Sequence, residues 1–259
     1  MTQKEIILAE EAEYVSETFA DCIKAEEYTL FYFDKCKELW EGNHAIIYPN
    51  KIKDLSNVLV EIKDFYAKQQ KEAAIFHPMA DEYYHYFEEN KEIIEKCGYE
   101  ITLNDDYKFM TLIGENKIDP SNLLDIKLLE HWDERIATDI ILQSEEYWEL
   151  ESTKVFSSRK NENNLLFVGY IGDKAIIYSI IHKSYNYDCV RFNYILCAKN
   201  HQGKGYGSEM ISHITNFCRN KGYSNCYQWA GPSESIVRKA GFLDVFTARS
   251  GRINAKLKL

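Results

Sequence analysis

Residues 192–221 read FNYILCAKNHQGKGYGSEMISHITNFCRNK, and this stretch decides the fold. A strand-like run over 192–198 leads into a glycine-rich loop, and an amphipathic helix follows. Three glycines in five residues, Gly203, Gly205 and Gly207, let the backbone turn tightly and approach a ligand closely. The helix directs its unpaired N–H groups and the positive end of its dipole at the same place. The sequence therefore predicts an anion site that would hold a diphosphate.

The spacing of apolar residues supports this helix. They recur at i, i+1, i+4, i+7 and i+8 and form one stripe: Met210, Ile211, Ile214, Phe217 and Cys218. Gly222 stands where a C-terminal cap belongs, after a last turn that contains basic residues. Ser208 can cap or flank the first turn directly after the glycines. We therefore predict a strand, a loop and a helix in direct succession.

Three kinds of phosphate-binding loop are distinguished by their spacing. A Walker loop requires G-x-x-x-x-G-K-[ST], which is absent. A dinucleotide fingerprint requires G-x-G-x-x-G early in a doubly wound sheet, whereas here the spacing is G-x-G-x-G and only about fifty residues follow. The third pattern, Q/R-x-x-G-x-G/A between a strand and a helix, is met by Gln202, Gly205 and Gly207. It resembles the acyl-coenzyme A loop of the GNAT acetyltransferase superfamily.

The resemblance covers roughly residues 107–259 and is strongest over 165–246. The order of expected elements fits that family: a hairpin over 165–171 and 175–182 around Gly172-Asp173, strands over 189–198 and 224–229, and a short helix over 233–241 that ends in Gly241-Phe242. The resemblance implies an α/β (α+β) fold, with a mixed, mostly antiparallel sheet flanked by helices.

The resemblance also implies how acetyl-coenzyme A would be held as cosubstrate. The strand before the loop would splay from its neighbour, and the backbone of Ile195, Leu196 and Cys197 would pair with the pantetheine in the gap. One N–H near Cys197 would polarise the thioester carbonyl, a contribution of about 3 kcal/mol. The pyrophosphate would rest on the loop residues: Gln202, Gly203, Lys204, Gly205, Tyr206, Gly207 and Ser208.

The catalytic groups are not identified by the same resemblance. Relatives often place a tyrosine four residues before the glycine of Gly-Phe, and this chain has Val237 there. Relatives also often carry a Glu or His at positions that match Arg191 or Asn193 when alternation is counted back from Cys197. Neither residue is a base at neutral pH. The general acid and base stay unassigned, with Asn193, Tyr227 and Glu234 as candidates and His182 and Trp229 beside them, and each has an alternative role in packing or at a strand or helix end.

Cysteine chemistry is not expected. Cys197 lies in a strand without a His or Asp at a spacing that forms a dyad, so it is interpreted as a small hydrophobic residue. The seven cysteines contain no C-x-x-C pair, which indicates neither a metal site nor a disulfide framework. Free cysteines, no basic-then-apolar start and no long apolar segment predict a cytoplasmic protein without membrane contact.

Charge divides the chain unevenly. Residues 1–115 hold 12 Lys and Arg against 25 Asp and Glu, whereas residues 116–259 hold 19 against 16. We therefore predict two domains, 1–115 and 116–259. The acidic first half argues against nucleic-acid binding, because such affinity depends mainly on phosphate neutralisation.

The first half repeats the order of the second. Strands over 43–48 and 73–76, helices over 55–66 and 81–97, and the pair Gly98-Tyr99 predict a tandem of GNAT-like domains. The first copy lacks a glycine loop, so it would pack against the second, shape the substrate entrance or mediate a homodimer. Further helices, expected over 119–129 and 133–149 with Ile136, Ile140, Ile141 and Trp148 on one side, would wall the acceptor pocket.

The function that these observations favour is N-acetyl transfer. An acetyl group would pass from acetyl-coenzyme A to a primary amine of a small molecule or peptide by direct attack in a ternary complex. One alternative is a coenzyme A-binding sensor or partner-binding protein without turnover, in agreement with the missing tyrosine. Another is a transferase that uses a different acyl donor.

Overall fold

The computed structural model describes residues 1–18, 20–35, 37, 39, 42–77, 81–118, 122–144, 150, 153–154, 163–231 and 233–255. The chain forms two compact units. The glycine-loop unit comprises Met1–Glu10 and Lys108–Phe246, and the companion unit comprises Glu11–Tyr107 and Thr247–Leu259.

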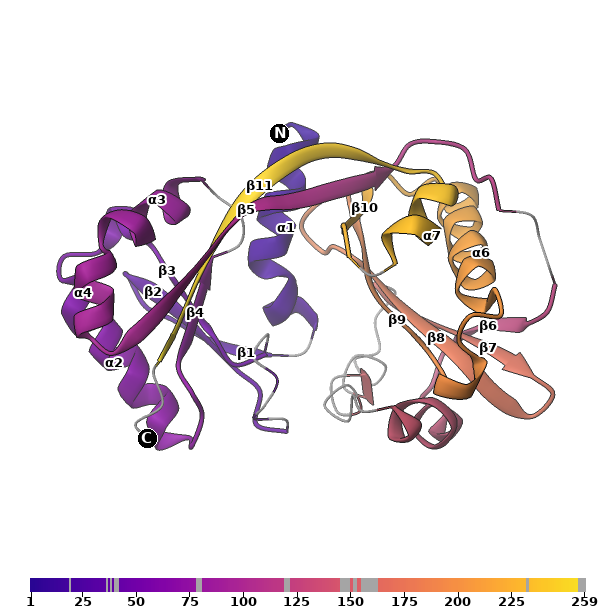
Figure 1. The fold of residues 1–259 in the computed structure, drawn as a ribbon, viewed down its shortest axis with the longest axis horizontal. Helices are drawn as coiled ribbons and strands as arrows, with labels where there is room; N and C mark the ends of the chain where they lie inside the picture. Colours follow the sequence, from indigo (N-terminus) through magenta and orange to yellow (C-terminus); the bar gives the residue numbers. More distant parts are fainter. Residues whose placement is uncertain are drawn as a thin grey trace. The chain divides into compact units, whose positions relative to one another are not determined.

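The glycine-loop unit contains a mixed sheet in the order β5-β10-β9-β8-β7-β6 (Figure 1). Strands β6 to β9 form an antiparallel meander, β9 and β10 are parallel, and β10 is antiparallel to β5. The elements are β6 (Asp125–Leu129), η3 (Ile136–Ile140), η4 (Ile141–Gln143), β7 (Asn164–Ile171), β8 (Lys174–Lys183), β9 (Val190–Cys197), η5 (Lys199–His201), α6 (Tyr206–Lys221), β10 (Cys226–Trp229) and α7 (Glu234–Lys239). The predicted hairpin, loop helix and short last helix are therefore confirmed.

Two apolar cores cover the two faces of this sheet. On one face, Ile177 and Ile181 of β8 pack with Met210, Ile211 and Ile214 of α6, which lies along the sheet (Figure 1). On the other face, Tyr178 and Ile180 of β8 pack with residues of η3. Because β8 is buried on both faces, its sequence is an almost continuous apolar run and not an alternating one.

Helix α6 ends as its sequence predicts. Gly222 adopts φ +67 at the C-terminal cap, and its N–H donates to the carbonyl of Arg219. The N–H of Tyr223 donates to the carbonyl of Cys218 at 3.0 Å. These two bonds form a Schellman motif, which a glycine completes without the penalty that a Cβ atom brings at positive φ.

The companion unit has the sheet order β1-β2-β3-β4-β11-β5. Helix α2 covers one face of it with the buried residues Val58, Leu59, Ile62 and Tyr66. The elements are α1 (Gln3–Thr18, which begins in the glycine-loop unit), β1 (Asp21–Lys24), β2 (Tyr28–Tyr32), β3 (Ala45–Ile47), η2 (Pro49–Lys51), α2 (Leu55–Lys68), β4 (Ala74–His77), α3 (Asp81–Glu89), α4 (Lys91–Lys96), β5 (Tyr99–Leu112) and β11 (Phe242–Ala255).

The two units share an order of strand pairing. In the companion unit β2 and β3 are antiparallel, and β3 and β4 are parallel around α2. In the glycine-loop unit β8 and β9 are antiparallel, and β9 and β10 are parallel around α6. The predicted tandem of GNAT-like domains goes beyond this shared order and stays a prediction.

The compact units differ from the predicted division at residues 115 and 116. Strand β5 passes from the companion unit into the glycine-loop unit, where it pairs with β10, and β11 passes the other way to pair with β4. The segments Met1–Glu10 and Thr247–Leu259 each belong to the unit of the opposite chain half. Charge composition does not reveal this exchange, because the exchange depends on which strands form hydrogen bonds.

Two helix predictions are corrected. The helix expected over 81–97 is divided at Asn90, whose side chain donates to the carbonyl of Tyr86 at 2.9 Å and so competes with the helical backbone bonds. Within the segment 119–129, residues Asp125–Leu129 form the strand β6, because they complete the edge of β7. Residues 119–121 and 145–149, including Trp148, lie outside the described residues.

In the described part of the helix expected over 133–149, the chain forms a short π turn and a 3-10 turn instead, in which Ile136, Ile140 and Ile141 are buried. Among the described residues, no helix has the length and apolar character needed to cross a bilayer.

The glycine of the Gly241-Phe242 pair leads to a prediction about stability. Gly241 adopts φ +105, and a Cβ atom there would lie 2.4 Å from the carbonyl oxygen of Gly114. We expect Gly241→Ala to lower the free energy of unfolding by about 2 kcal/mol or more, as measured by urea denaturation. Gly231→Ala is the control, because open space surrounds that position, and its stability should stay within about 1 kcal/mol of the parent. An equal effect of the two substitutions would contradict this account.

Candidate functional site

The loop between β9 and α6 contains two glycines in the left-handed region. Gly203 has φ +75, and Gly205, the N-terminal cap of α6, has φ +89. A Cβ atom at either position would meet no atom within 4 Å, and residues 202–205 are exposed. Glycine is therefore favoured here by backbone conformation, and the loop surface is open to a ligand.

The first turn of α6 provides backbone donors. Glu209 N–H makes the first intrahelical bond, to the carbonyl of Gly205 at 3.1 Å, and no side chain caps the helix. Ser208 lies within the first turn and not at the cap. The amides of residues 205–208 have no intrahelical acceptor by helix geometry, and the dipole of this 16-residue helix favours an anion beside them. Lys204 is exposed in the same loop and adds positive charge.

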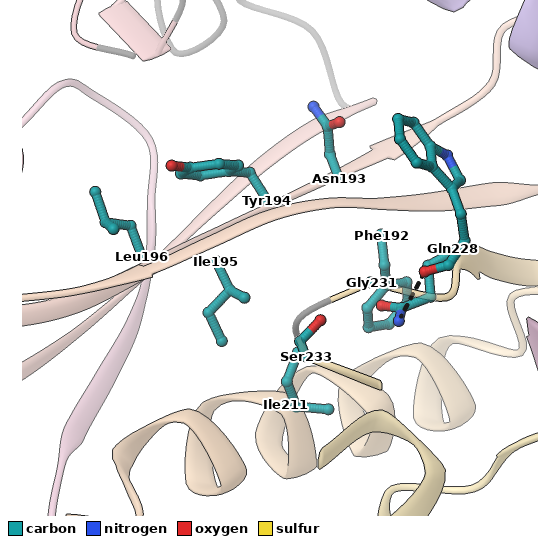
Figure 2. A pocket seen from close by; sticks show the side chains of 10 residues that line it. Phe192, Asn193, Tyr194, Ile195, Leu196, Ile211, Gln228, Gly231 and Ser233 are labelled. Carbon is teal, nitrogen blue, oxygen red and sulfur yellow. Dashed lines mark hydrogen bonds between the residues drawn. The ribbon is translucent and has the colours of Figure 1, made fainter. Parts of the chain in front are cut away.

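Strands β9 and β10 part soon after they meet. Their parallel pairing is confined to Val190 with Cys226 and Arg191 with Tyr227. Beyond this point β9 continues to Cys197 beside β8, and a cavity of about 360 Å³ opens between the diverging strands. It is lined by Phe192, Asn193, Tyr194, Ile195, Leu196, Ile211, Gln228, Trp229, Gly231 and Ser233 (Figure 2).

Side chains from both sides of β9 line the cavity. Figure 2 shows Ile195 on the side of β9 that faces Ile211 of α6, whereas Asn193 and Tyr194 lie on the opposite side. Phe192 packs edge-on against Phe242 with ring centroids 5.0 Å apart, so the Gly-Phe pair supports one end of the cavity. A ligand between the strands would contact Ile195, Ile211 and Ser233 on the side toward α6, and Asn193, Tyr194 and Leu196 on the other side.

The three strand residues predicted to hold a cosubstrate divide into two groups. Ile195 and Leu196 line the cavity, whereas Cys197 lies at the end of β9 next to the loop. The Nε2 group of Gln202 donates to the carbonyl of Cys197 at 3.2 Å and so ties the loop to the strand. Burial raises the pKa of the Cys197 thiol, and the charge of Lys204 offsets part of that effect. The thiol is therefore neutral at physiological pH.

Of the three catalytic candidates, Asn193 alone lines this cavity. Tyr227 is fully buried, and its ring lies 6.1 Å from that of Phe109. Glu234 accepts a hydrogen bond from Nε of Arg238 at 2.7 Å, in an ion pair on α7. Val237, at the position where a tyrosine was sought, is also fully buried.

Alternation along β9 does not hold, and the expectation that Arg191 shares a face with Cys197 is wrong. Strand β8 pairs Ile180 with Tyr194 and Ile181 with Phe192, so Asn193 is the extra residue of a β-bulge. The bulge turns Arg191 to the side of Tyr194, away from α6. A one-residue insertion exchanges the two faces, because side chains alternate with a period of two.

Two polar residues of the cavity, Gln228 and Ser233, were not predicted from the sequence. Gln228 follows Tyr227 on β10 and is buried, and Ser233 precedes α7. The hydroxyl of Ser233 makes no cap bond to α7, and Figure 2 shows the side chain beside the cavity. No sequence signal marks these residues, because their role depends on where β10 leaves β9.

Within the described ranges, no three His, Cys, Asp or Glu side chains gather as they would around a metal ion. The site therefore offers backbone amides, one cationic loop and a narrow cavity with amide and hydroxyl groups. Such a set can bind an anion at one end and orient a neutral polar group at the other.

Comparison with known proteins gives the site a context. The family model described as "Acetyltransferase (GNAT) family" matches residues 128–240, which include β7, β8, β9, α6 and α7. A sequence search of curated proteins finds no match.

Solved structures with the same fold cover nearly the whole chain. A GCN5-related N-acetyltransferase from Kribbella flavida aligns with a TM-score of 0.64 and 10% identity over 97% of this chain and 95% of that chain. A functionally unknown conserved protein from Staphylococcus epidermidis ATCC 12228 aligns with a TM-score of 0.60 and 14% identity over 98% of this chain and 97% of that chain. A GCN5-related N-acetyltransferase-like protein from Streptococcus suis 89/1591 aligns with a TM-score of 0.53 and 11% identity over 96% of this chain and 99% of that chain. These likenesses confirm the expected mixed α/β fold.

The raised pKa of Cys197 gives a prediction about its reactivity. Alkylation by iodoacetamide requires the thiolate, so its rate should rise with pH to a midpoint above that of free cysteine, about 8.5. The rate is measured by mass spectrometry of the peptide that contains Cys197, with an unstructured peptide that contains one cysteine as the reference. A midpoint below that of the reference would show an activated thiolate and reopen the nucleophile hypothesis.

Proposed function

We propose that this protein is an N-acetyltransferase of the GNAT family, whose model matches residues 128–240. The family and the fold are those of acyltransferases. In this proposal the donor is acetyl-coenzyme A, and the acceptor is a primary amine of a small molecule or a peptide.

One observation carries the proposal: the cavity between β9 and β10 lies on the strand that runs directly into the glycine loop of α6. A thioester with a long polar arm and a diphosphate matches such a site in length and in chemistry. The arm would lie along Ile195 and Leu196, and the diphosphate would accept from the amides of residues 203–208. Lys204 and the dipole of α6 would favour the negative charge.

The reaction would proceed by direct attack. The neutral amine nitrogen forms a bond with the acetyl carbonyl carbon, the C–S bond breaks, and coenzyme A leaves as the thiol after proton transfer. A backbone N–H near Cys197 would stabilise the oxyanion, an effect of about 3 kcal/mol for one donor. The neutral, half-buried Cys197 favours this route over an acyl-enzyme, since an acyl-enzyme would require a thiolate.

The acceptor would approach from the side of β9 opposite α6, where Asn193 and Tyr194 lie (Figure 2). Asn193 is the candidate for orienting the amine, because an amide both donates and accepts hydrogen bonds. Tyr227 and Glu234 are not proposed for this step, since the first is fully buried and the second is paired with Arg238. Orientation of the amine against the thioester can supply several kcal/mol of the barrier reduction.

A second candidate function is coenzyme A binding without turnover. Two observations favour it: Val237 replaces the tyrosine that relatives often use, and none of the described residues that line the cavity is a carboxylate. The two functions share the same cosubstrate site and differ only in chemistry.

The cosubstrate site is tested with Gly205→Glu. The new carboxylate would stand among the amide donors, so we expect the affinity for acetyl-coenzyme A to fall by about 100-fold or more in calorimetric titration, or about 2.7 kcal/mol. Gly172→Glu is the matched control, because Gly172 also has positive φ with no atom within 4 Å, but lies in the β7–β8 turn. Equal binding by parent and Gly205→Glu would refute the loop assignment.

Turnover is tested by thiol release. With acetyl-coenzyme A and a panel of primary amines, we expect amine-dependent release of coenzyme A, detected with a thiol reagent, and an acetylated product in mass spectra. Cys197→Ala should keep the parental kcat within about twofold, because no covalent intermediate forms there. Tight binding of acetyl-coenzyme A without release for any amine would favour the binding protein instead.

A further inference from the structure

Arg191 is a buried cation at the point where β9 and β10 part. Its exposed fraction is 5%, and it belongs to the last residue pair that joins the two strands. Burial of a guanidinium is costly unless its charge and its donors are satisfied. A buried arginine at this position therefore calls for an explanation beyond packing.

The contacts of Arg191 reach both walls of the cavity. Its Nη1 group donates to Oδ1 of Asn193, the bulge residue of β9. Its guanidinium lies over the ring of Trp229 on β10, 5.0 Å from the centroid. Asn193 and Trp229 both line the cavity. One side chain thus connects the two strands at the place where their backbone pairing has ended.

A buried polar layer lies behind Arg191 on the same face of the sheet. His182 of β8 is its cross-strand partner, and Nδ1 of His182 lies 2.6 Å from Oδ1 of Asn164. The Nε2 atom of His182 lies 3.7 Å from Oε1 of Glu10, and both side chains are fully buried. The carboxyl group of Glu10 therefore lies beside His182 in this buried layer.

We propose that Arg191 is a positioning residue for acyl transfer, which acts through Asn193 and Trp229. The inference rests on the function proposed above. The hydrogen bond to Asn193 sets the orientation of its amide, with the oxygen toward Arg191, and the stacked contact holds Trp229 on the opposite wall. Arg191 therefore sets the geometry of the wall against which the acceptor would lie, while the loop of α6 would hold the diphosphate independently.

The shape of the guanidinium matters for this role. It is planar, so it can stack on an indole and donate to an amide in the same plane, whereas a lysine ammonium keeps the charge without this geometry. Arg191→Lys therefore removes the positioning contacts and retains the positive charge.

The experiment is a double-mutant cycle on the full chain with acetyl-coenzyme A and an acceptor amine found in the thiol-release screen. Arg191→Lys and Asn193→Ala are each expected to lower kcat by about 10- to 100-fold. The kcat of the double variant should be no lower than that of the more impaired single variant, because both substitutions remove the same contact between Arg191 and Asn193. The Kd for acetyl-coenzyme A should stay within about threefold, since the loop contacts are unchanged.

A matched control lies in the companion unit. Nε of Arg252 donates to Oδ1 of Asn254 at 2.8 Å, which is the same residue pair at the same two-residue spacing on β11. Arg252→Lys should leave kcat and Kd unchanged. Urea unfolding of every variant checks that the fold is kept. If Arg191→Lys fails to fold, Arg191→Gln replaces it in the cycle: an unchanged kcat overturns the proposal, and a lowered kcat with unchanged Kd supports it.

The results distinguish a failure of the proposed role of Arg191 from a failure of the proposed function. The role of Arg191 alone is overturned if the parent binds and turns over acetyl-coenzyme A but Arg191→Lys keeps the full kcat. It is also overturned if the effects of the two single substitutions on kcat multiply in the double variant. A parent that does not bind acetyl-coenzyme A overturns the proposed function and this role with it. Loss of kcat at constant Kd with a non-additive cycle supports the proposal.

Discussion

The early end of the pairing between β9 and β10 is the constraint on which the site depends. Two parallel residue pairs join these strands, and the β-bulge at Asn193 follows at once. A strand edge inside a protein needs partners for its N–H and C=O groups. Here the edge of β9 borders a cavity, so a ligand with amides of its own could complete the hydrogen bonds that β10 does not provide.

The site departs from ordinary folding rules at several neighbouring positions. Gly203 and Gly205 take left-handed conformations, Asn193 interrupts the ladder, and Arg191 places a cation in the interior. The bulge and the buried cation each cost stability, and the surrounding apolar cores on both faces of β8 offset that cost. Such departures gather where a protein binds and reacts, because positions under no functional demand follow the local rules.

Local patterns predicted the elements whose structure is set by neighbouring residues. The apolar stripe of α6, its glycine cap at Gly222 and the Gly172-Asp173 hairpin are confirmed, since helix periodicity and turn chemistry act within a few residues. The strand β6, the division at Asn90 and the long strands β5 and β11 were not predicted. Strands depend on distant partners, and the residues 125–129 become a strand only because β7 offers them an edge.

The candidate site likewise combines features that neighbouring residues determine with features that depend on residues far apart in the chain. The sequence by itself determined the glycine loop, the helix that follows it and the GNAT resemblance, because spacing and backbone freedom are local properties. The tertiary structure alone decided that Arg191 turns away from α6, that Tyr227 is enclosed, and that Gln228 and Ser233 border the cavity. A single bulge reverses the faces of a strand, and the point where two strands separate depends on contacts between residues far apart in the chain.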